Sequence, residues 1–119
     1  MYEIVIYSDR NGNEPVSEYL QELAKSKTKD SRIRLNKIGQ YINVLKEYGT
    51  RAGEPYMKHI DGDIWELRPT SDRVFFGACV KGTFVLLHCF PKKSQKTPER
   101  EKQQAQKELA DYLKRTGGK

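Results

Sequence analysis

The chain has 119 residues, of which 32% are charged and 36% hydrophobic, and its formal net charge is +6 at pH 7. This length suits one domain with a modest core, and no run approaches the roughly 20 apolar residues of a membrane span. We therefore expect a single domain over residues 1–119 and no membrane association. The first residues also lack the basic start of a signal peptide, which favours a cytoplasmic location.

The excess of lysine and arginine is typical of proteins with a polyanionic partner, because cations that neutralise phosphates release condensed counterions. Many basic proteins bind no nucleic acid, so charge alone leaves this question open. Cys79 and Cys89 stand outside any cluster of histidine and cysteine. This favours buried thiols over a disulfide or a zinc site, and we expect neither a metal site nor a cofactor.

The first half of the chain predicts one strand followed by two helices. Alternating β-forming residues indicate the strand, and apolar residues at helical spacing indicate the helices. Gly39, inside the second helix, costs about 1 kcal/mol relative to alanine, and Gly49 stands where a glycine is expected to end that helix. A short polar joint predicts that the two helices form a hairpin. The expected elements are a strand at residues 2–7, a helix from Pro15 to Ala24 and a helix from about Asp30 to Tyr48.

The second half changes to a period of two and predicts four strands and a last helix. Lys81 and Gly82 form a two-residue hairpin signal, and Thr97 is expected to cap the last helix. That helix either packs on the sheet edge or folds only with a partner. The predicted class is α+β in the order β-α-α-β-β-β-β-α, an antiparallel (mixed) sheet packed on the N-terminal αα-hairpin, with a C-terminal helix. The strands are expected at residues 57–60, 64–68, 73–80 and 83–90, and the helix from Pro98 to about Arg115.

Regular pairing outward from the Lys81–Gly82 turn sorts the side chains of the last two strands onto two faces. One face is apolar and is expected to meet the helices, whereas the other is expected to be open and to lead into the basic loop at residues 92–97. A register slip of one residue would undo this sorting. The apolar face comprises Val74, Phe76, Ala78, Val85, Leu87 and Cys89, and the open face gathers Arg68, Arg73 and His88 with Glu66 beside them.

Arginines and lysines that converge over a sheet are suited to binding phosphate. RNA carries its own nucleophile, the 2′-hydroxyl. Cleavage then needs a base, cations that stabilise the charge on phosphorus and a proton for the leaving oxygen, without a required metal ion. The residues predicted to fill these roles are Arg68, Arg73, Lys92, Lys93 and His88.

Each of these residues also has a simpler interpretation. Arginine and lysine on a sheet face often serve solubility. His88, between Leu87 and Cys89 at the end of an apolar strand, is also typical of a partly buried, hydrogen-bonded histidine. Glu66 is equally consistent with an ion-pair partner that orients an arginine.

Four motifs in order resemble the phage-derived HigB-like branch of the RelE/ParE toxin superfamily, and the resemblance extends over nearly the whole chain. The resemblance implies a type II toxin that cleaves mRNA in the ribosomal A site and that a cognate antitoxin, typically a small helix-turn-helix protein, neutralises. The motifs are Ile64-Trp65-Glu66-Leu67-Arg68, Arg73-Val74-Phe75-Phe76, Val85-Leu86-Leu87-His88-Cys89-Phe90 and Lys92-Lys93-Ser94-Gln95-Lys96-Thr97-Pro98.

The resemblance also implies roles for single residues. Arg68 and Arg73 match the positions expected to hold the scissile phosphate. Lys92 and Lys93 match a basic pair near it, one of them a candidate general base or electrostatic stabiliser. The residues expected to contact RNA are Gln95, Lys96, Thr97 and Glu66.

Two other functions are compatible with the same fold. A ParE-like toxin would bind DNA gyrase, and an inactive relative would serve as an antitoxin or a DNA-binding partner. Convergent phosphate-binding cations favour the RNA enzyme, because a gyrase-directed surface does not need them. We therefore expect a metal-independent mRNA endoribonuclease that works on the ribosome and inhibits translation.

Overall fold

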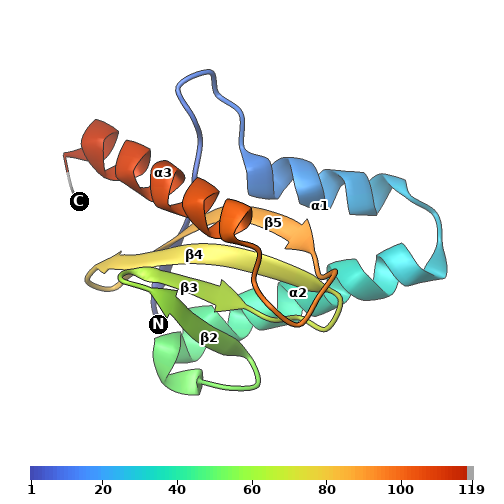
Figure 1. Ribbon diagram of the computed structural model, residues 1–119. Helices are drawn as coiled ribbons and strands as arrows, with labels where there is room; N and C mark the ends of the chain where they lie inside the picture. The colour runs from blue at the N-terminus through green and yellow to red at the C-terminus, as the bar shows by residue number, and fades with distance from the viewer. Residues whose placement is uncertain (118–119) are drawn as a thin grey trace.

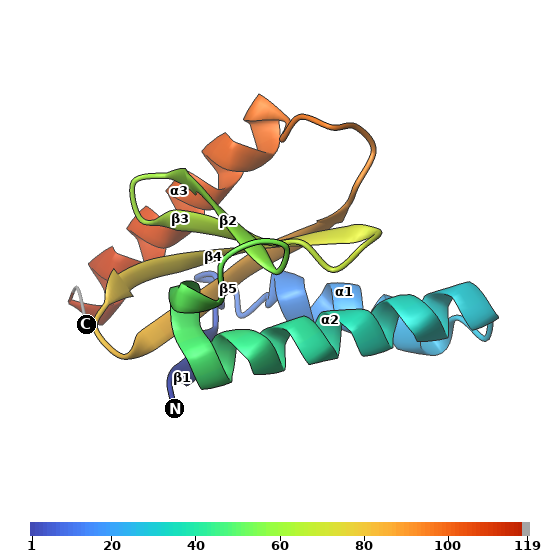
Figure 2. The ribbon, with the colours of Figure 1, turned by 90° about the horizontal axis from the view of Figure 1, so that it is seen from below.

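A five-stranded sheet lies between two helical layers, as Figure 1 and Figure 2 show. The computed structural model describes residues 1–117. Within that range, none of the helices combines the length and the apolar character needed to cross a membrane. The elements in chain order are β1 (Glu3–Ile6), α1 (Pro15–Lys25), α2 (Lys29–Tyr48), a 3-10 helix η1 (Gly49–Ala52), β2 (Met57–Asp61), β3 (Ile64–Leu67), β4 (Asp72–Val80), β5 (Thr83–Pro91) and α3 (Glu99–Thr116).

The strands follow the order β1-β5-β4-β3-β2 across the sheet. β1 runs parallel to β5, and each neighbouring pair from β5 to β2 is antiparallel. A parallel neighbour cannot be joined by a tight turn, so the chain leaves β1 for the helical hairpin and three further strands before it returns as β5. The predicted α+β class, with its mixed sheet, N-terminal hairpin and C-terminal helix, is confirmed.

Local chemistry fixes the ends of the helical hairpin. Pro15 is the first residue of α1, where its missing N–H leaves no hydrogen bond unmade. Thr28 caps α2, because its hydroxyl accepts a hydrogen bond of 3.1 Å from the backbone N–H of Ser31. α2 ends at Gly49, whose φ of 65° lies in the left-handed region that glycine adopts without a steric penalty. A Cβ on Gly49 would also lie only 2.8 Å from the ring of Tyr2.

Replacing Gly39 with alanine is expected to raise the free energy of unfolding by about 0.5–1 kcal/mol. Gly39 lies on the exposed side of α2, and a Cβ at this position would meet no atom within 4 Å. Alanine reduces the conformational freedom of the unfolded chain without strain in the folded helix. Urea unfolding followed by circular dichroism measures the change, and a loss of stability would contradict the open helical environment of this residue.

Each face of the sheet has its own apolar core. On one face α1 and α2 pack against the strands, with Ile38 and Phe76 both fully buried there. On the other face α3 packs against the sheet through Leu109, close to Phe75. Gly77 permits this approach, since a Cβ on Gly77 would lie 2.7 Å from the Cδ1 atom of Leu109. The last helix therefore lies along a sheet face and not at its edge.

The prediction of an open sheet face is wrong, because α3 covers the apolar part of that face (Figure 2). The stripe of apolar residues on α3 is narrow, and sequence alone did not show that it meets a second core. α3 does not cover the end of this face where β3 ends and β4 begins.

Irregular pairing between β4 and β5 makes the predicted sorting of the β5 side chains wrong in part. The hairpin pair Val80–Thr83 and the sorting of β4 are confirmed, but the register shifts twice along the two strands. A β-bulge inserts an unpaired residue and so exchanges the faces beyond it. As a result Phe84 and Leu86 face α1 and α2, whereas Val85 and Leu87 face α3.

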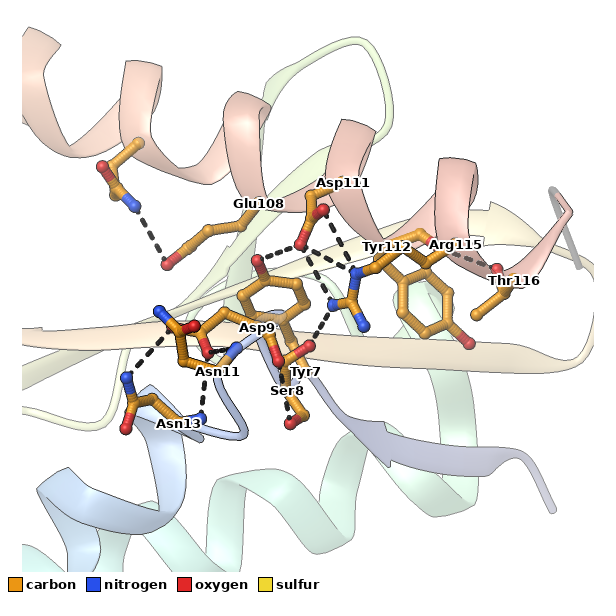
Figure 3. Close-up of polar contacts among 11 residues, drawn as sticks. Tyr7, Ser8, Asp9, Asn11, Asn13, Glu108, Asp111, Tyr112, Arg115 and Thr116 are labelled. Atoms are coloured by element: carbon orange, nitrogen blue, oxygen red, sulfur yellow. Dashed lines mark hydrogen bonds and ion pairs between the residues drawn. The ribbon is translucent and has the colours of Figure 1, made fainter.

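Polar contacts tie the C-terminal end of α3 to the segment that follows β1. The hydroxyl of Tyr7 donates a hydrogen bond of 2.6 Å to Asp111, and Arg115 pairs with the same carboxylate and donates to the carbonyl of Ser8. Figure 3 shows these side chains converging between the helix and the segment after β1. Burial, together with the hydrogen bond to Asp111, raises the pKa of Tyr7 to about 12. This end of α3 is therefore held by polar contacts in addition to the apolar core.

Candidate active site

A polar pocket opens where β3 ends and β4 begins, beneath the loop that joins β5 to α3. Eight of the nine predicted site residues line it, and His88 does not. The end of the sheet face that α3 leaves free and the basic loop above it thus form one site. The pocket is lined by Glu66, Arg68, Arg73, Phe90 and residues 92–98.

The turn between β3 and β4 places both arginines in the pocket. Arg68 follows the last residue of β3, and Arg73 is the second residue of β4. Within the turn, Thr70 adopts a φ of 50°, a conformation that costs a non-glycine residue about 1 kcal/mol or more. The Nη1 atom of Arg73 donates to the carbonyls of Thr70 and Asp72, at 3.4 and 2.8 Å. The strained turn therefore helps to fix the direction of the Arg73 guanidinium.

Asp72 anchors the start of β4 from the opposite face of the sheet. Its side chain is 0% exposed and accepts hydrogen bonds of 3.1 and 2.7 Å from Arg34 and of 2.5 Å from the hydroxyl of Tyr19. One buried carboxylate therefore links α1, α2 and β4. Because Arg73 is the next residue, this network also fixes the backbone from which Arg73 extends.

Glu66 forms the buried floor of the pocket and is 2% exposed. Its Oε2 atom lies 3.7 Å from Nε of Arg68 and 4.0 Å from Nε of Arg73, and its Oε1 atom accepts a hydrogen bond of 3.2 Å from Thr97. Burial raises the pKa of Glu66, although Arg73, Thr97 and Arg68 act in the opposite direction. Burial likewise lowers the pKa of Arg73, against the attraction of Glu66. The pocket lining contains five cationic side chains and one carboxylate. Its net charge is therefore positive.

One buried donor in the pocket has no hydrogen-bond partner. Within residues 1–117, the Nε atom of Arg68 is buried and makes no hydrogen bond, although such groups are nearly always paired. An oxyanion between the two arginines would supply the missing acceptor and the missing negative charge. Over the same residues, no group of three or more histidine, cysteine, aspartate or glutamate side chains is placed to hold a metal ion.

The basic loop is held at both of its ends. The backbone N–H of Lys92 donates to the carbonyl of Ser71 at 2.9 Å, and Thr97 at the other end donates to Glu66. The predicted N-cap role of Thr97 is wrong, because Pro98 occupies the N-cap position of α3 and makes no side-chain cap. Lys92, Lys93, Gln95 and Lys96 are exposed at the rim of the pocket.

His88 lies on the same sheet face as the pocket but under α3, and it is 7% exposed. Its Nδ1 atom lies 2.6 Å from Glu108 and its Nε2 atom 3.0 Å from Glu101. The ring of Phe75 packs edge-on against it, with ring centroids 5.5 Å apart. The structure therefore places His88 as a buried, hydrogen-bonded histidine outside the pocket lining.

The stability of the protein is expected to fall as pH rises from 6 to 9, and His88 is the reason. Burial alone would lower the pKa of His88, but the hydrogen bonds and charges of Glu108 and Glu101 outweigh it and raise the pKa. A raised folded-state pKa means that the stabilisation is complete below the unfolded value of about 6.5 and is lost as pH rises through the folded value. Urea unfolding of a His59→Gln variant, in which His88 is the remaining histidine, tests this. Stability that stays level or rises over that range would contradict it.

The sequence did not single out the residues that support the arginines. Asp72 stands just before the strand predicted at residues 73–80, and Arg34 is one of several cations in the predicted second helix. A signal was present, since Arg34 stands four residues before Ile38 and so shares the buried stripe of that helix. A charged residue in such a stripe indicates a buried partner of opposite charge.

In a comparison with protein families, residues 19–110 match the family described as "Phage derived protein Gp49-like (DUF891)". The matched range begins in α1 and ends in α3, so it contains every residue that lines the pocket. No curated protein matches the chain.

Proposed function

The chain belongs to the Gp49-like family of phage-derived proteins, and on that basis we propose that it is the toxin of a type II toxin–antitoxin system. In this proposal the protein is a metal-independent endoribonuclease of the RelE/HigB type, which cleaves mRNA on the ribosome and so inhibits translation. Its partners would be the ribosome with its mRNA and, in the resting cell, a cognate antitoxin. All of these are found in the cytoplasm.

The observation that carries the proposal is that Arg68 and Arg73 both lie beside Glu66, while the buried Nε atom of Arg68 makes no hydrogen bond. Two guanidinium groups offer planar donors that match the oxygens of a phosphate diester. Glu66 supplies an acceptor within 4.0 Å of both. A bound phosphate and a nearby base are the two requirements for attack by a 2′-hydroxyl.

The reaction follows from these positions. With the scissile phosphate on the two arginines, the 2′-hydroxyl would approach the Oε2 atom of Glu66, because Thr97 occupies Oε1. Glu66 takes the proton as the bond from O2′ to phosphorus forms and the bond from phosphorus to O5′ breaks. The leaving O5′ takes a proton from a loop lysine, Lys92 or Lys93. The products are a cyclic 2′,3′-phosphate and a free 5′-hydroxyl.

Two features of Glu66 suit it to this role. Its pKa is raised by burial, and a general base is most effective when its pKa lies nearer the working pH. Thr97 holds one oxygen in place, which leaves the other oriented toward the arginines. His88 has no place in this mechanism, because Glu101 and Glu108 occupy both of its ring nitrogens.

The surroundings of the pocket support the proposed dependence on the ribosome. The loop lysines at its rim are exposed, so they attract RNA without fixing its geometry. Reaction rates depend steeply on the alignment of the attacking group with the bond that breaks. A larger assembly that holds the mRNA in register would supply this alignment.

Primer extension on mRNA from cells that briefly express the protein tests the proposal. We expect cleavage within translated regions, and none in a matched transcript that lacks its start codon. Uncut mRNA with arrested growth and DNA damage would favour a ParE-like toxin that acts on DNA gyrase. Uncut mRNA with normal growth would favour an inactive relative.

A further inference from the structure

His88 is a buried titratable group that the proposed reaction does not use. Both of its ring nitrogens face carboxylates, Glu108 at 2.6 Å and Glu101 at 3.0 Å. A neutral imidazole carries one N–H and can donate to only one of them. The two contacts are satisfied together when the ring is doubly protonated, as an imidazolium between two carboxylates.

The Glu101 contact leads directly to the basic loop. Glu101 lies in the first turn of α3, and its backbone N–H donates to the carbonyl of Pro98 at 3.1 Å. The residue before Pro98 is Thr97, which donates to Glu66 on the floor of the pocket. A chain of contacts therefore runs from His88 on β5, through the first turn of α3, to the catalytic carboxylate.

The two ends of the loop are held in different ways. At Lys92 the loop continues from β5 and bonds to the carbonyl of Ser71, so the sheet itself fixes that end. At Thr97 the loop depends on where the first turn of α3 lies. Two sheet residues contact the start of α3 through their side chains: His88 lies 3.0 Å from Glu101, and Asp61 of β2 forms a longer and more exposed ion pair of 3.8 Å with Lys102.

We propose that the imidazolium of His88 is a positioning group that holds the first turn of α3 through Glu101 and thereby keeps Thr97 and the basic loop in place over Glu66. The proposed positioning of the loop is argued from the contacts in this chain alone. Its consequence for catalysis rests on the proposed function. When His88 loses its proton, the shorter and more buried contact with Glu108 keeps the remaining N–H. The lone pair on Nε2 then faces the carboxylate of Glu101, and that contact is lost.

The groups around His88 support a response to pH. From α3 it is faced by Glu101 and Glu108, and the uncharged rings beside it are those of Phe75 on β4 and Phe90 on β5 itself. Tyr7, after β1, interacts with Glu108, and its own raised pKa keeps it neutral below pH 10. The proton on His88 is therefore the one that decides whether Glu101 is held.

The test uses nuclear magnetic resonance of the full chain, because the backbone amides of residues 92–97 report the loop without any RNA. Glu101→Ala removes the contact, and Glu99→Ala is the matched control, since Glu99 lies in the same helical turn but pairs with Lys102. We expect Glu101→Ala to shift the loop amides and Glu99→Ala to leave them in place. Loop amides that respond equally to both variants, or to neither, would overturn the proposal.

The pH dependence of the Thr97 amide signal provides a second test. A purely structural role of Glu101 would not make this signal follow the titration of His88. In the wild-type chain the amide of Thr97 is expected to follow the titration of the His88 ring. Glu101→Gln should abolish this response, because a glutamine amide can accept from the imidazolium and donate to the neutral ring. Tyr7→Phe removes the anchor at the far end of α3 and should leave the response unchanged. A neutral His88 ring at pH 6, or a Thr97 amide that ignores its titration, would contradict the proposal.

Cleavage assays connect the positioning to the reaction. On ribosomes loaded with mRNA we expect Glu101→Ala to cut about 10- to 100-fold more slowly than Glu99→Ala, the effect of a misplaced catalytic group. Equal cleavage rates would show that the loop position does not limit the reaction and would overturn the catalytic part. If no variant cuts RNA, the proposed function fails, and the loop amides still decide whether His88 positions the loop.

Discussion

Alanine in place of Arg73 is expected to lower the rate of mRNA cleavage on ribosomes by about two to three orders of magnitude, the usual effect of removing a charged donor from a transition state. The Nη1 atom of Arg73 is already bonded to the carbonyls of Thr70 and Asp72, which leaves Nε and Nη2 for the phosphate. In the proposed reaction the negative charge on the phosphoryl oxygens grows as O2′ attacks, so the guanidinium would bind the transition state more strongly than the substrate. Single-turnover cleavage on purified ribosomes measures the change.

Two further variants separate charge from geometry. Arg73→Lys keeps the charge but loses the planar pair of donors, and we expect it to be intermediate. Lys107→Ala removes an exposed cation of α3 outside the pocket and should cut at the wild-type rate. A folded Arg73→Ala protein, shown by its circular dichroism spectrum, that cuts at the wild-type rate would contradict the assignment of the pocket.

The largest loss of stability is expected from Asp72→Ala, at about 3 kcal/mol. Removal of this buried carboxylate leaves Arg34 and the hydroxyl of Tyr19 without the acceptor that both of them use. The side chain of Arg34 is 23% exposed, so water replaces part of what is lost, and the effect falls at the lower end of the range for a broken buried ion pair. A small domain has about 5–15 kcal/mol in total, so this loss is a large share.

Urea unfolding at pH 7 measures this loss, and Asp63→Ala provides the control. Asp63 is an exposed aspartate in the turn between β2 and β3, and its removal should change the free energy of unfolding by less than about 0.5 kcal/mol. A second effect is expected in Asp72→Ala, because Arg73 is the next residue along the chain. Cleavage by the folded fraction should fall too, and a variant as stable as the wild type would show that the network has no role in stability.

The element order and the site residues near the turn from β3 to β4 could be predicted from the sequence, because both depend on local patterns. Strand alternation and helical spacing act over a few residues, and Arg68 and Arg73 share a face because of the short turn between them. The bulges in β4 and β5 could not be predicted in this way. An extra residue in one strand leaves no local trace, and it exchanged the faces of Phe84 and Val85.

The contacts of α3 were also beyond local patterns. His88 and Thr97 each have partners that only the docked helix or the closed loop brings near, namely Glu108, Glu101 and Glu66. Each of these pairs joins residues separated by 13 to 31 positions. A single sequence shows which of these residues are charged, but it does not show which of them are in contact in the folded protein.

The pairing of β1 with β5 bears on when the protein becomes complete during its synthesis. Thr83 lies beside Glu3 in the sheet, 80 residues away, and Tyr7 bonds to Asp111 across 104 residues. Long-range pairs of this kind form late, since the intervening chain must be ordered first. The basic loop and α3 follow β5, so they leave the ribosomal exit tunnel after all five strands of the sheet. The pocket of a nascent chain is therefore unfinished until all five strands, the basic loop and the first turn of α3 have emerged from the ribosome.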